Sequence, residues 1–256
     1  MTSYGLLYDA NQVSSIQLTD RLPLKLQSGD GICSIEFVRN GERSRKVVGR
    51  SNSRPTGRYP SFRMKRMIQW DSPHELNAYR LLDSNPNVLE FSEQPCIIHY
   101  RLNGVEHRHY PDSLVRTKNG KTLWEVKTTA DASKHDIAAR TRLMTQQLPA
   151  YGYHYVVALA EDLRREPRLK NVRLLLRLGR TALTFDQIEF TRRLMGRTDA
   201  LTWGEVLAGR YSPFTIEQAC RLVLDNVLNL NLDVQIDAAT ILSKTDATHF
   251  FGASHV

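Results

Sequence analysis

Two short motifs in the middle of the chain contain the residue types needed to hydrolyse a phosphodiester. The first is Pro111-Asp112, and after twelve intervening residues comes Glu125-Val126-Lys127. Mg²⁺ is a hard cation that is usually held by one or two carboxylates together with water and a substrate phosphate. Such a cation activates water and neutralises charge on the phosphate. Asp112 and Glu125 are therefore candidate ligands for Mg²⁺, with Mn²⁺ able to substitute, and Lys127 is a candidate for activating the attacking water.

A hairpin would bring the two motifs together. Alternate residues share one face of a strand, so Glu125 and Lys127 point the same way while the residue between them points into the core. A turn at Asn119-Gly120 would place Asp112 and Glu125 on neighbouring strands. The alternative is that Asp112 only caps a turn and that Glu125 and Lys127 form an exposed pair on a strand.

A third carboxylate stands upstream, at the start of a predicted helix. Ser72 occupies an N-cap position, Pro73 the first helical position, and Glu75 follows three residues after Ser72, as in a capping box. The helix is predicted to run to about Asp83. Glu75 is a candidate to support a second metal ion or to order the site through water.

The excess positive charge lies in the first two thirds of the chain. Residues 1–170 contain 26 Lys and Arg against 18 Asp and Glu, whereas residues 171–256 contain 9 of each. Residues 39–66 contain ten basic residues and one acid. Phosphate contacts made by Lys and Arg release counterions, so this segment is a candidate DNA-binding surface. The alternative is a solvated basic surface without a partner.

The candidate DNA-binding side chains in this segment are Arg45, Lys46, Arg50, Arg54, Arg58, Arg63, Lys65 and Arg66.

Histidines and tyrosines near the two motifs are weaker candidates. His107 and His109 share a predicted strand face and have the chemistry to bind a transition metal. His109 is also a candidate for a phosphate contact beside the site. The tyrosines at positions 151, 153 and 155 fit core and strand packing better than a platform for stacking bases.

Several other classes of protein are not indicated. The sequence has no Gly-rich phosphate loop ending in Lys-Ser/Thr, so no nucleotide cofactor is expected. Its three cysteines are far apart, which gives neither a disulfide framework nor a CxxC metal site. No apolar run approaches the roughly 20 residues that cross a bilayer, and no signal peptide is recognisable. We expect a protein of the prokaryotic cytoplasm, associated with the nucleoid when it acts, and no membrane partner.

The elements around the motifs predict an α/β core. Strands are expected at residues 32–38, 95–100, 105–110, 112–116, 122–127 and 154–159, and a second helix at 134–151. Asn103-Gly104 is a hairpin turn signal. The expected core order is helix, three antiparallel strands, helix, strand.

A charged segment at residues 162–170 is the expected domain boundary. Beyond it, helices are expected at 185–195, 202–207 and 215–228, followed by a strand pair within 230–242. This pattern predicts a small, mostly helical, winged-helix-like module. The expected division is a basic N-terminal segment (1–68), part of or packed on the nuclease domain, a catalytic core (69–165) and the C-terminal module (166–256).

The order of these motifs resembles that of the TnsA transposon endonucleases, which have a restriction-endonuclease-like fold and PD-(D/E)xK catalytic motifs. The similarity covers about residues 59–162 and is looser in the C-terminal module. It rests on residues 60–68, on 71–75 and on Gln94-Pro95, together with the two motifs described above. The resemblance implies a mixed sheet flanked by helices.

Four residues take roles from this resemblance. The helix glutamate of the family falls on Glu75, its metal-binding aspartate on Asp112, and its paired strand residue and lysine on Glu125 and Lys127. Some relatives have Gln where this chain has Glu125. The acid at this position favours a fully ligated metal site.

The resemblance also implies a substrate and partners. The substrate would be double-stranded DNA at transposon ends, cut on the 5′ side of the element. A DDE transposase would cut and join the 3′ ends, and an ATP-dependent regulator would dock on the C-terminal region. Two alternatives remain open, namely a restriction or repair nuclease with the same fold, and a catalytically inactive DNA-binding adaptor.

Overall fold

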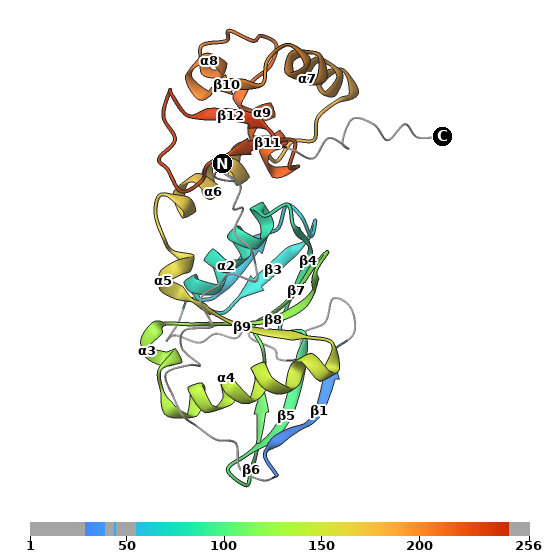
Figure 1. Cartoon of the computed structure of the whole chain (residues 1–256), viewed down its shortest axis with the longest axis vertical. Coiled ribbons are helices and arrows are strands. Elements are labelled where there is room, and N and C mark those ends of the chain that lie inside the picture. Colours follow the sequence, from blue (N-terminus) through green and yellow to red (C-terminus); the bar gives the residue numbers. More distant parts are fainter. Residues whose placement is uncertain (1–28, 39–43, 45–54, 246–256) are drawn as a thin grey trace, which may run out of the picture. The chain divides into compact units, whose positions relative to one another are not determined.

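The computed structural model describes residues 29–38, 44 and 55–245 (Figure 1). The expected DNA-binding residues Arg45, Lys46, Arg50 and Arg54 lie outside this part of the chain. The described residues fall into two compact units. The N-terminal unit comprises the described residues up to 83 together with 87–164, and the C-terminal unit comprises 84–86 and 165–245. No helix within the described ranges is long and apolar enough to span a bilayer.

A four-stranded mixed sheet forms the centre of the N-terminal unit. Its strand order is β4-β7-β8-β9, in which β8 and β9 are parallel and the other neighbours are antiparallel. The strands are β4 (Val88–Glu93), β7 (Ser113–Thr117), β8 (Gly120–Lys127) and β9 (His154–Leu159). The predicted strands 112–116, 122–127 and 154–159 are confirmed, whereas β4 was not predicted.

The β7–β8 hairpin has the predicted turn and register. Thr117 pairs with Gly120, and Ser113 pairs with Trp124. The turn requires a glycine because Gly120 has a φ of +137°. This register places the residue before β7 beside the end of β8, which is where the two candidate catalytic motifs lie.

A second, antiparallel sheet has the order β1-β5-β6. Its strands are β1 (Gly31–Phe37), β5 (Cys96–Leu102) and β6 (Val105–His109). The turn between β5 and β6 is Asn103-Gly104, whose φ angles of 52° and 76° are those of a type I′ hairpin. The expected strands 32–38, 95–100 and 105–110 are therefore confirmed.

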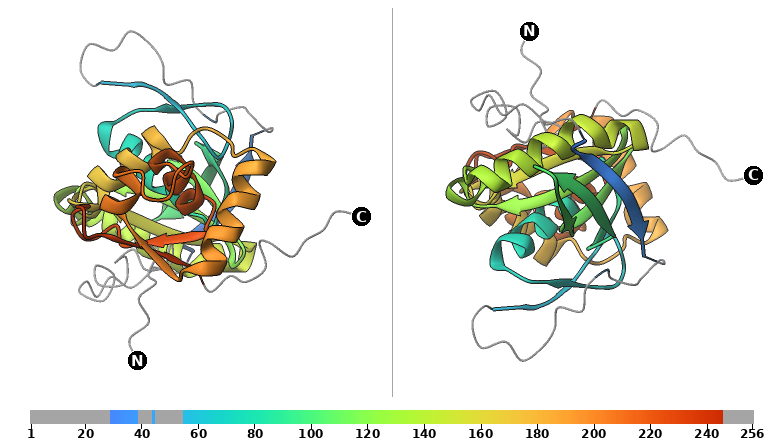
Figure 2. Two further views of the ribbon diagram at one scale, coloured as in Figure 1. Left: turned by 90° about the horizontal axis from the view of Figure 1, so that it is seen from above. Right: turned by 90° about the horizontal axis from the view of Figure 1, so that it is seen from below.

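Helices cover both sides of the mixed sheet. Figures 1 and 2 show α2 (Pro73–Ser84) and α4 (His135–Gln147) on opposite sides of β8 and β9. Leu143 and Met144 of α4 are fully buried in a core that includes Leu123 of β8 and Val157 of β9. The short helices α3 (Thr129–Ala132), η1 (Leu148–Tyr151) and α5 (Ala160–Leu163) complete this unit.

A small hairpin, β2 (Gly57–Pro60) and β3 (Met67–Trp70), was not predicted from the sequence. Its turn is anchored on the fully buried Asp83 of α2. The carboxylate of Asp83 accepts hydrogen bonds from the hydroxyls of Tyr59 and Ser61, each at 2.6 Å. It also accepts bonds from the backbone N–H groups of residues 62 and 63, at 2.7 and 2.8 Å. One side chain thus fixes a turn that bears several basic residues.

The C-terminal unit combines helices with a three-stranded sheet of order β10-β12-β11. Its elements are α6 (Arg168–Leu178), α7 (Phe185–Arg197), β10 (Ala200–Thr202), α8 (Trp203–Leu207), α9 (Ile216–Leu224), β11 (Leu228–Leu230) and β12 (Ile241–Lys244). The three expected helices are present, and complete capping boxes start α8 and α9. The end of the segment read as a boundary is instead the first turn of α6, an unpredicted helix.

We predict that Asp83→Ala destabilises the N-terminal unit by about 3 kcal/mol, because it leaves two buried and two partly buried hydrogen-bond donors without their acceptor. Urea unfolding followed by circular dichroism measures the change. Glu106→Ala removes an exposed carboxylate that pairs with the exposed Arg101, and little change is expected there. A loss below about 1 kcal/mol in Asp83→Ala would show that the turn does not depend on this anchor.

Candidate active site

Asp112 is fixed at the start of β7 through both its side chain and its backbone. Its Oδ2 atom accepts a hydrogen bond from the backbone N–H of Val126 at 2.6 Å. Its carbonyl oxygen accepts bonds from the backbone N–H of Gln94 at 2.9 Å and from the hydroxyl of Tyr79 at 3.4 Å. The side-chain bond joins the two candidate catalytic motifs directly across the hairpin.

Glu125 lies on β8 with its carboxylate surrounded by positive and polar groups. Its Oε1 atom is 2.5 Å from Nζ of Lys127 and 3.2 Å from Nη2 of Arg140. Its Oε2 atom is 3.7 Å from Nε2 of His109 and has no hydrogen-bond partner. The side chain of Glu125 is only 5% exposed, so the alternative of an exposed pair with Lys127 is wrong. The predicted shared face of Glu125 and Lys127 is confirmed by their contact.

Glu75 is buried at the first turn of α2 and is held there by its own cap. Its Oε1 atom accepts a hydrogen bond from the hydroxyl of Ser72 at 3.0 Å, and Oε2 accepts one from the backbone N–H of Asp71 at 2.9 Å. The hydroxyl of Ser72 in turn accepts the backbone N–H of Glu75. The cap therefore differs from a standard capping box, because the carboxylate bonds the residue before the N-cap.

The three carboxylates interact electrostatically. Burial raises the pKa of Asp112 well above its usual value, and the negative charges of Glu125 and Glu75 raise it further. Burial also raises the pKa of Glu75, and the charge of Asp71 adds to this effect. A partly buried cluster of like charges favours either a proton or a cation.

The pKa of Glu125 moves in the opposite direction. Burial alone would raise it, but His109, Lys127 and Arg140 together lower it. Burial holds the pKa of His109 at about 4, so at neutral pH the positive charges beside Glu125 are those of Lys127 and Arg140. Burial lowers the pKa of Lys127, but the negative charges of Glu125 and Asp112 raise it by more, so the pKa is raised overall. Lys127 is therefore an ammonium group at neutral pH.

The donor set at this site suits a hard divalent cation. Asp112 and Glu125 supply carboxylate oxygens, which are the ligands that Mg²⁺ prefers. The buried Oε2 atom of Glu125 lacks a hydrogen-bond donor, and a bound cation would satisfy it. Across the residues that the structure describes, no three carboxylate, imidazole or thiol groups converge closely enough to enclose a metal by themselves. The remaining ligands would therefore have to be water or phosphate.

Comparison with known families agrees with this geometry. Residues 85–158 match the family model described as TnsA-like endonuclease N terminal. This segment is TnsA-like. The match includes Asp112, Glu125 and Lys127 but not Glu75, and it covers less than a third of the chain. It confirms the resemblance noted in the sequence and indicates a nuclease. No protein with a curated description matches the chain.

His109 lies in the TnsA-like segment and is buried beside Glu125. The side chain is only 3% exposed, and its Nε2 atom is 2.9 Å from the hydroxyl of Tyr155. The same nitrogen is 3.7 Å from Oε2 of Glu125, so the imidazole lies beside the candidate metal site, and its contact with phosphate stays a prediction. His107, by contrast, is exposed and stacks on Tyr100.

Sequence reasoning missed Arg140 and assigned Tyr155 to packing alone. Tyr155 is buried on β9, and Arg140 is on α4 with a side chain only 15% exposed. A signal for Arg140 did exist. It stands three and four residues before Leu143 and Met144, which are fully buried, so it shares their face of the helix. A charged residue on such a face indicates a buried partner of opposite charge.

The described DNA-binding candidates are in the β2–β3 hairpin and differ in their freedom to bind. Arg58 and Lys65 are exposed. Arg63 is half-buried beside the turn anchored by Asp83. Arg66 makes two hydrogen bonds to the buried carboxylate of Glu93, at 3.0 and 2.6 Å. Its guanidinium is thus part of a structural ion pair, which leaves Arg58 and Lys65 as the better phosphate-binding candidates.

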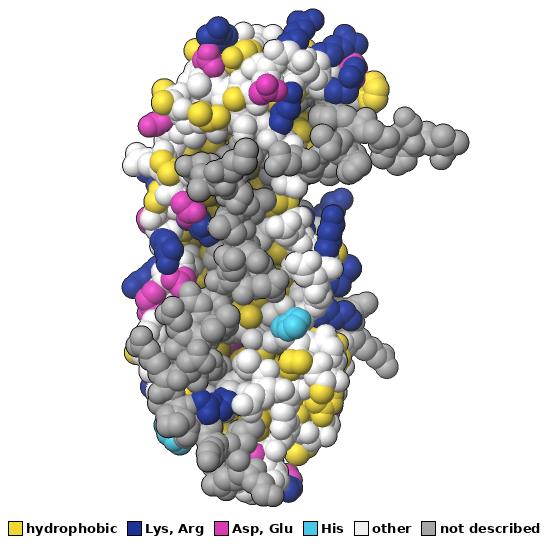
Figure 3. Space-filling view, viewed as in Figure 1, with side chains coloured by type: hydrophobic (Ala, Val, Ile, Leu, Met, Phe, Trp, Pro, Cys, Tyr) yellow, Lys and Arg dark blue, Asp and Glu magenta, His cyan; other side chains and the backbone are white. Residues whose placement is uncertain are grey.

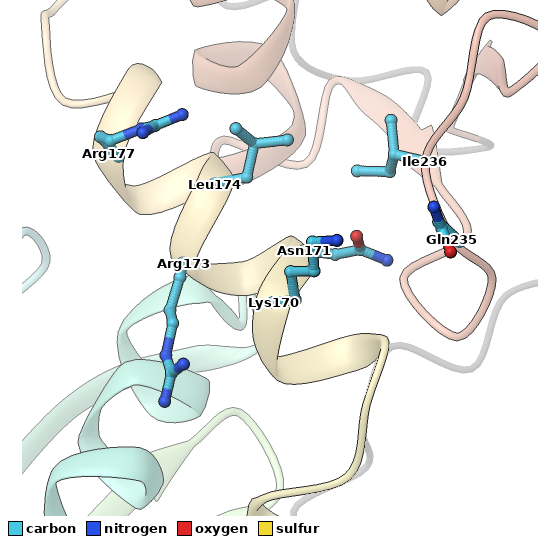
Figure 4. Close-up of a pocket in the computed structure, with 7 residues that line it drawn as sticks. All are labelled: Lys170, Asn171, Arg173, Leu174, Arg177, Gln235 and Ile236. Carbon is cyan, nitrogen blue, oxygen red and sulfur yellow. The ribbon is translucent and has the colours of Figure 1, made fainter.

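The C-terminal unit contains a pocket of about 320 Å³ between α6 and residues 235–236. Figure 4 shows Leu174 and Ile236 on opposite sides of it, whereas the guanidinium group of Arg173 points away. Basic side chains also gather over α7 on the face drawn in Figure 3. Two of them, Arg192 and Arg193, pair with Glu189. Neither feature brings together the groups needed for catalysis.

We predict that His109 makes folding stability depend on pH between about 6.5 and 4. Its pKa in the folded chain is about 4, against an ordinary value of 6.5. Below pH 6.5 the unfolded chain binds a proton that the folded chain does not, so stability falls as the pH drops, by about 3 kcal/mol in total. His109→Gln should lose less stability than the wild type between pH 7 and pH 4.5. Urea unfolding at the two pH values measures this difference.

An NMR titration of the imidazole tests the same point directly. A His109 signal that titrated near pH 6.5 would contradict a buried, neutral imidazole.

Proposed function

We propose that this chain is a metal-dependent DNA endonuclease that cleaves phosphodiester bonds at transposon ends, on the 5′ side of the element. The observation that carries the proposal is the meeting of Asp112, Glu125 and Lys127 across one hairpin of a TnsA-like segment. The mixed sheet flanked by helices is compatible with a restriction-endonuclease-like fold. We propose this fold for the N-terminal unit.

Asp112 and Glu125 would hold Mg²⁺, and Mn²⁺ could replace it. When bound, the metal would polarise the phosphate and lower the pKa of water. Lys127 is a protonated ammonium beside Glu125, with a side chain 26% exposed, so it is placed to orient a water molecule that enters from solvent. Glu75 would act through water or a second metal ion, since both its oxygens already accept hydrogen bonds from its cap.

Duplex DNA would be bound through its phosphates by the basic β2–β3 hairpin and by the preceding basic segment. Arg58 and Lys65 are exposed on this hairpin, and Asp83 fixes the turn between its strands. Because phosphate contacts position a duplex without reading its sequence, this surface would set the register of cleavage.

The C-terminal unit would serve as a protein-docking module. Its strand order β10-β12-β11, with α8 and α9 between β10 and β11, is that expected of a winged-helix-like module. Most of α9, the helix before the strand pair, is buried, which disfavours insertion of this helix into a DNA groove. We propose the division 1–68, 69–165 and 166–256. The partners would be a DDE transposase and an ATP-dependent regulator, in the cytoplasm of a prokaryote and at its nucleoid.

We predict that Asp112→Asn abolishes Mn²⁺ binding and cleavage while the fold stays at least as stable as the wild type. The amide oxygen can still accept the N–H of Val126, and the substitution removes one of three mutually repelling charges. Because the pKa of Asp112 is raised in the folded chain, its ionisation destabilises the fold at neutral pH. Calorimetry with Mn²⁺ and thermal unfolding in metal-free buffer measure the two effects.

Lys127→Met is the companion variant, and it should lose cleavage while keeping its fold and its affinity for duplex DNA. Cleavage is assayed on DNA containing transposon ends, with the transposase and regulator present. Wild-type rates in either variant would exclude this site as the catalytic centre.

We predict that Arg58→Ala and Lys65→Ala each weaken binding to duplex DNA of any sequence. Each should also reduce the slope of log affinity against log salt concentration by about 0.9, because one phosphate contact is lost. Fluorescence anisotropy over a range of salt concentrations measures the slope. Lys118→Ala is the matched control, since Lys118 is exposed at the β7–β8 turn, at the other end of the hairpin from Asp112. An equal effect in all three variants would indicate only a non-local effect of net charge.

A further inference from the structure

We propose that Arg140 is a positioning residue that holds Glu125 in the metal-free chain and must leave it when a divalent cation binds. This inference rests on the proposed metal-dependent nuclease site. It adds a regulatory feature to that site, namely that a helix outside the two catalytic motifs sets the affinity for the metal.

The first step of the argument is the contact itself. Nη2 of Arg140 is 3.2 Å from Oε1 of Glu125, and the same oxygen is 2.5 Å from Nζ of Lys127. Two positive groups therefore share one carboxylate oxygen. A cation approaching Glu125 would be repelled by both groups, and at these short distances in a partly buried site the repulsion is poorly screened.

The second step is the balance of formal charge. When all three carboxylates are ionised, as binding of a cation requires, Asp112, Glu125 and Glu75 bring three negative charges, and Lys127 and Arg140 bring two positive charges. The site is thus close to neutral without a metal. Adding a divalent cation alone would leave a net positive charge, whereas adding it with a DNA phosphate, or withdrawing Arg140, would restore the balance. The arrangement therefore favours joint binding of metal and DNA over binding of metal alone.

The third step is that Arg140 has a second polar neighbour. Tyr155 lies close enough to Arg140 to contribute to the raised pKa of the arginine. The hydroxyl of Tyr155 is in turn 2.9 Å from Nε2 of His109. The buried Nε atom of Arg140 has no hydrogen-bond partner, so contact with Glu125 does not satisfy the guanidinium. Arg140 would therefore keep a polar neighbour in Tyr155 after leaving Glu125.

The role of Arg140 differs from that of Lys127. Lys127 is on the same strand as Glu125 and belongs to the catalytic motif, so its removal would also remove chemistry. Arg140 reaches the site from α4, whose buried residues Leu143 and Met144 pack in the core. A substitution at Arg140 therefore changes the charge beside Glu125 while both carboxylate motifs stay intact.

The experiment is Mn²⁺ calorimetry on the full chain without DNA, comparing the wild type with Arg140→Met, Arg140→Lys and Arg101→Met. Arg140→Met removes the charge but keeps an unbranched side chain, and we expect it to bind Mn²⁺ about tenfold more tightly than the wild type, or better. Arg140→Lys keeps the charge and should bind as weakly as the wild type. Arg101→Met removes an equal charge from an exposed ion pair and controls for net charge.

Duplex DNA supplies the second measurement. It should tighten Mn²⁺ binding to the wild type more than to Arg140→Met, because the wild type depends more on the charge of the phosphate. Thermal unfolding of each variant shows whether the fold is kept. If Arg140→Met does not fold, the Mn²⁺ affinity of Arg140→Gln is measured instead, because the glutamine amide can still donate a hydrogen bond but has no charge.

The outcomes separate this inference from the proposed function. If Arg140→Met binds Mn²⁺ no more tightly than the wild type, the proposed role of Arg140 is wrong. The proposed metal site is still supported in that case if Asp112→Asn abolishes Mn²⁺ binding. If Arg140→Met and Arg140→Lys both lose stability and neither changes the affinity for Mn²⁺, Arg140 has only a structural role. Absence of Mn²⁺ binding in every variant, with and without DNA, would overturn both proposals.

Discussion

The candidate active site depends on one electrostatic constraint, namely that three carboxylates interact with one another where water can solvate them only in part. Asp112 shows the effect most clearly, because burial and the charges of Glu125 and Glu75 all raise its pKa. Such a cluster is stable only if something compensates it. In this chain, Lys127 and Arg140 compensate Glu125, and the hydroxyl and backbone donors of the helix cap compensate Glu75. The cation that we propose for this site would be a further compensating group for the three carboxylates.

The surrounding fold fixes these carboxylates before any cation or DNA arrives. The side chain of Asp112 is bonded to the backbone of β8, and its carbonyl oxygen to the backbone of Gln94. Glu75 is held by the first turn of α2. Preorganised groups of this kind need little rearrangement when charge develops during a reaction. The two positive groups are less constrained, because the ammonium of Lys127 and the guanidinium of Arg140 are at the ends of long side chains that have several rotatable bonds.

The sequence predicted the parts of this site that depend on local signals. The turn at Asn119-Gly120 and strand alternation were enough to place Asp112 beside Glu125, and Ser72 with Pro73 located the helix that bears Glu75. The β2–β3 hairpin and α6 were missed, because the first is fixed by distant Asp83 and the second begins within a charged segment that was read as a boundary. The burial of His109 could not be predicted for a similar reason. Alternation placed His107 and His109 on one face of β6, but only the contact of His109 with Tyr155 of β9 shows that His109 is buried while His107 is exposed.

Arg140 shows why the charge of such a site cannot be read from its motifs alone. The motifs specify which carboxylates and which lysine lie close together, and their contacts depend on the register of the β7–β8 hairpin. The guanidinium that completes the charge balance comes from α4, and its distance from Glu125 depends on how Leu143 and Met144 seat that helix in the core. Because packing and electrostatics meet at this helix, a change in the volume of the core would alter the charge beside Glu125 without a substitution in either candidate motif. Under the proposed function, the affinity of the site for a cation would therefore depend on the packing of the N-terminal unit as well as on its motifs.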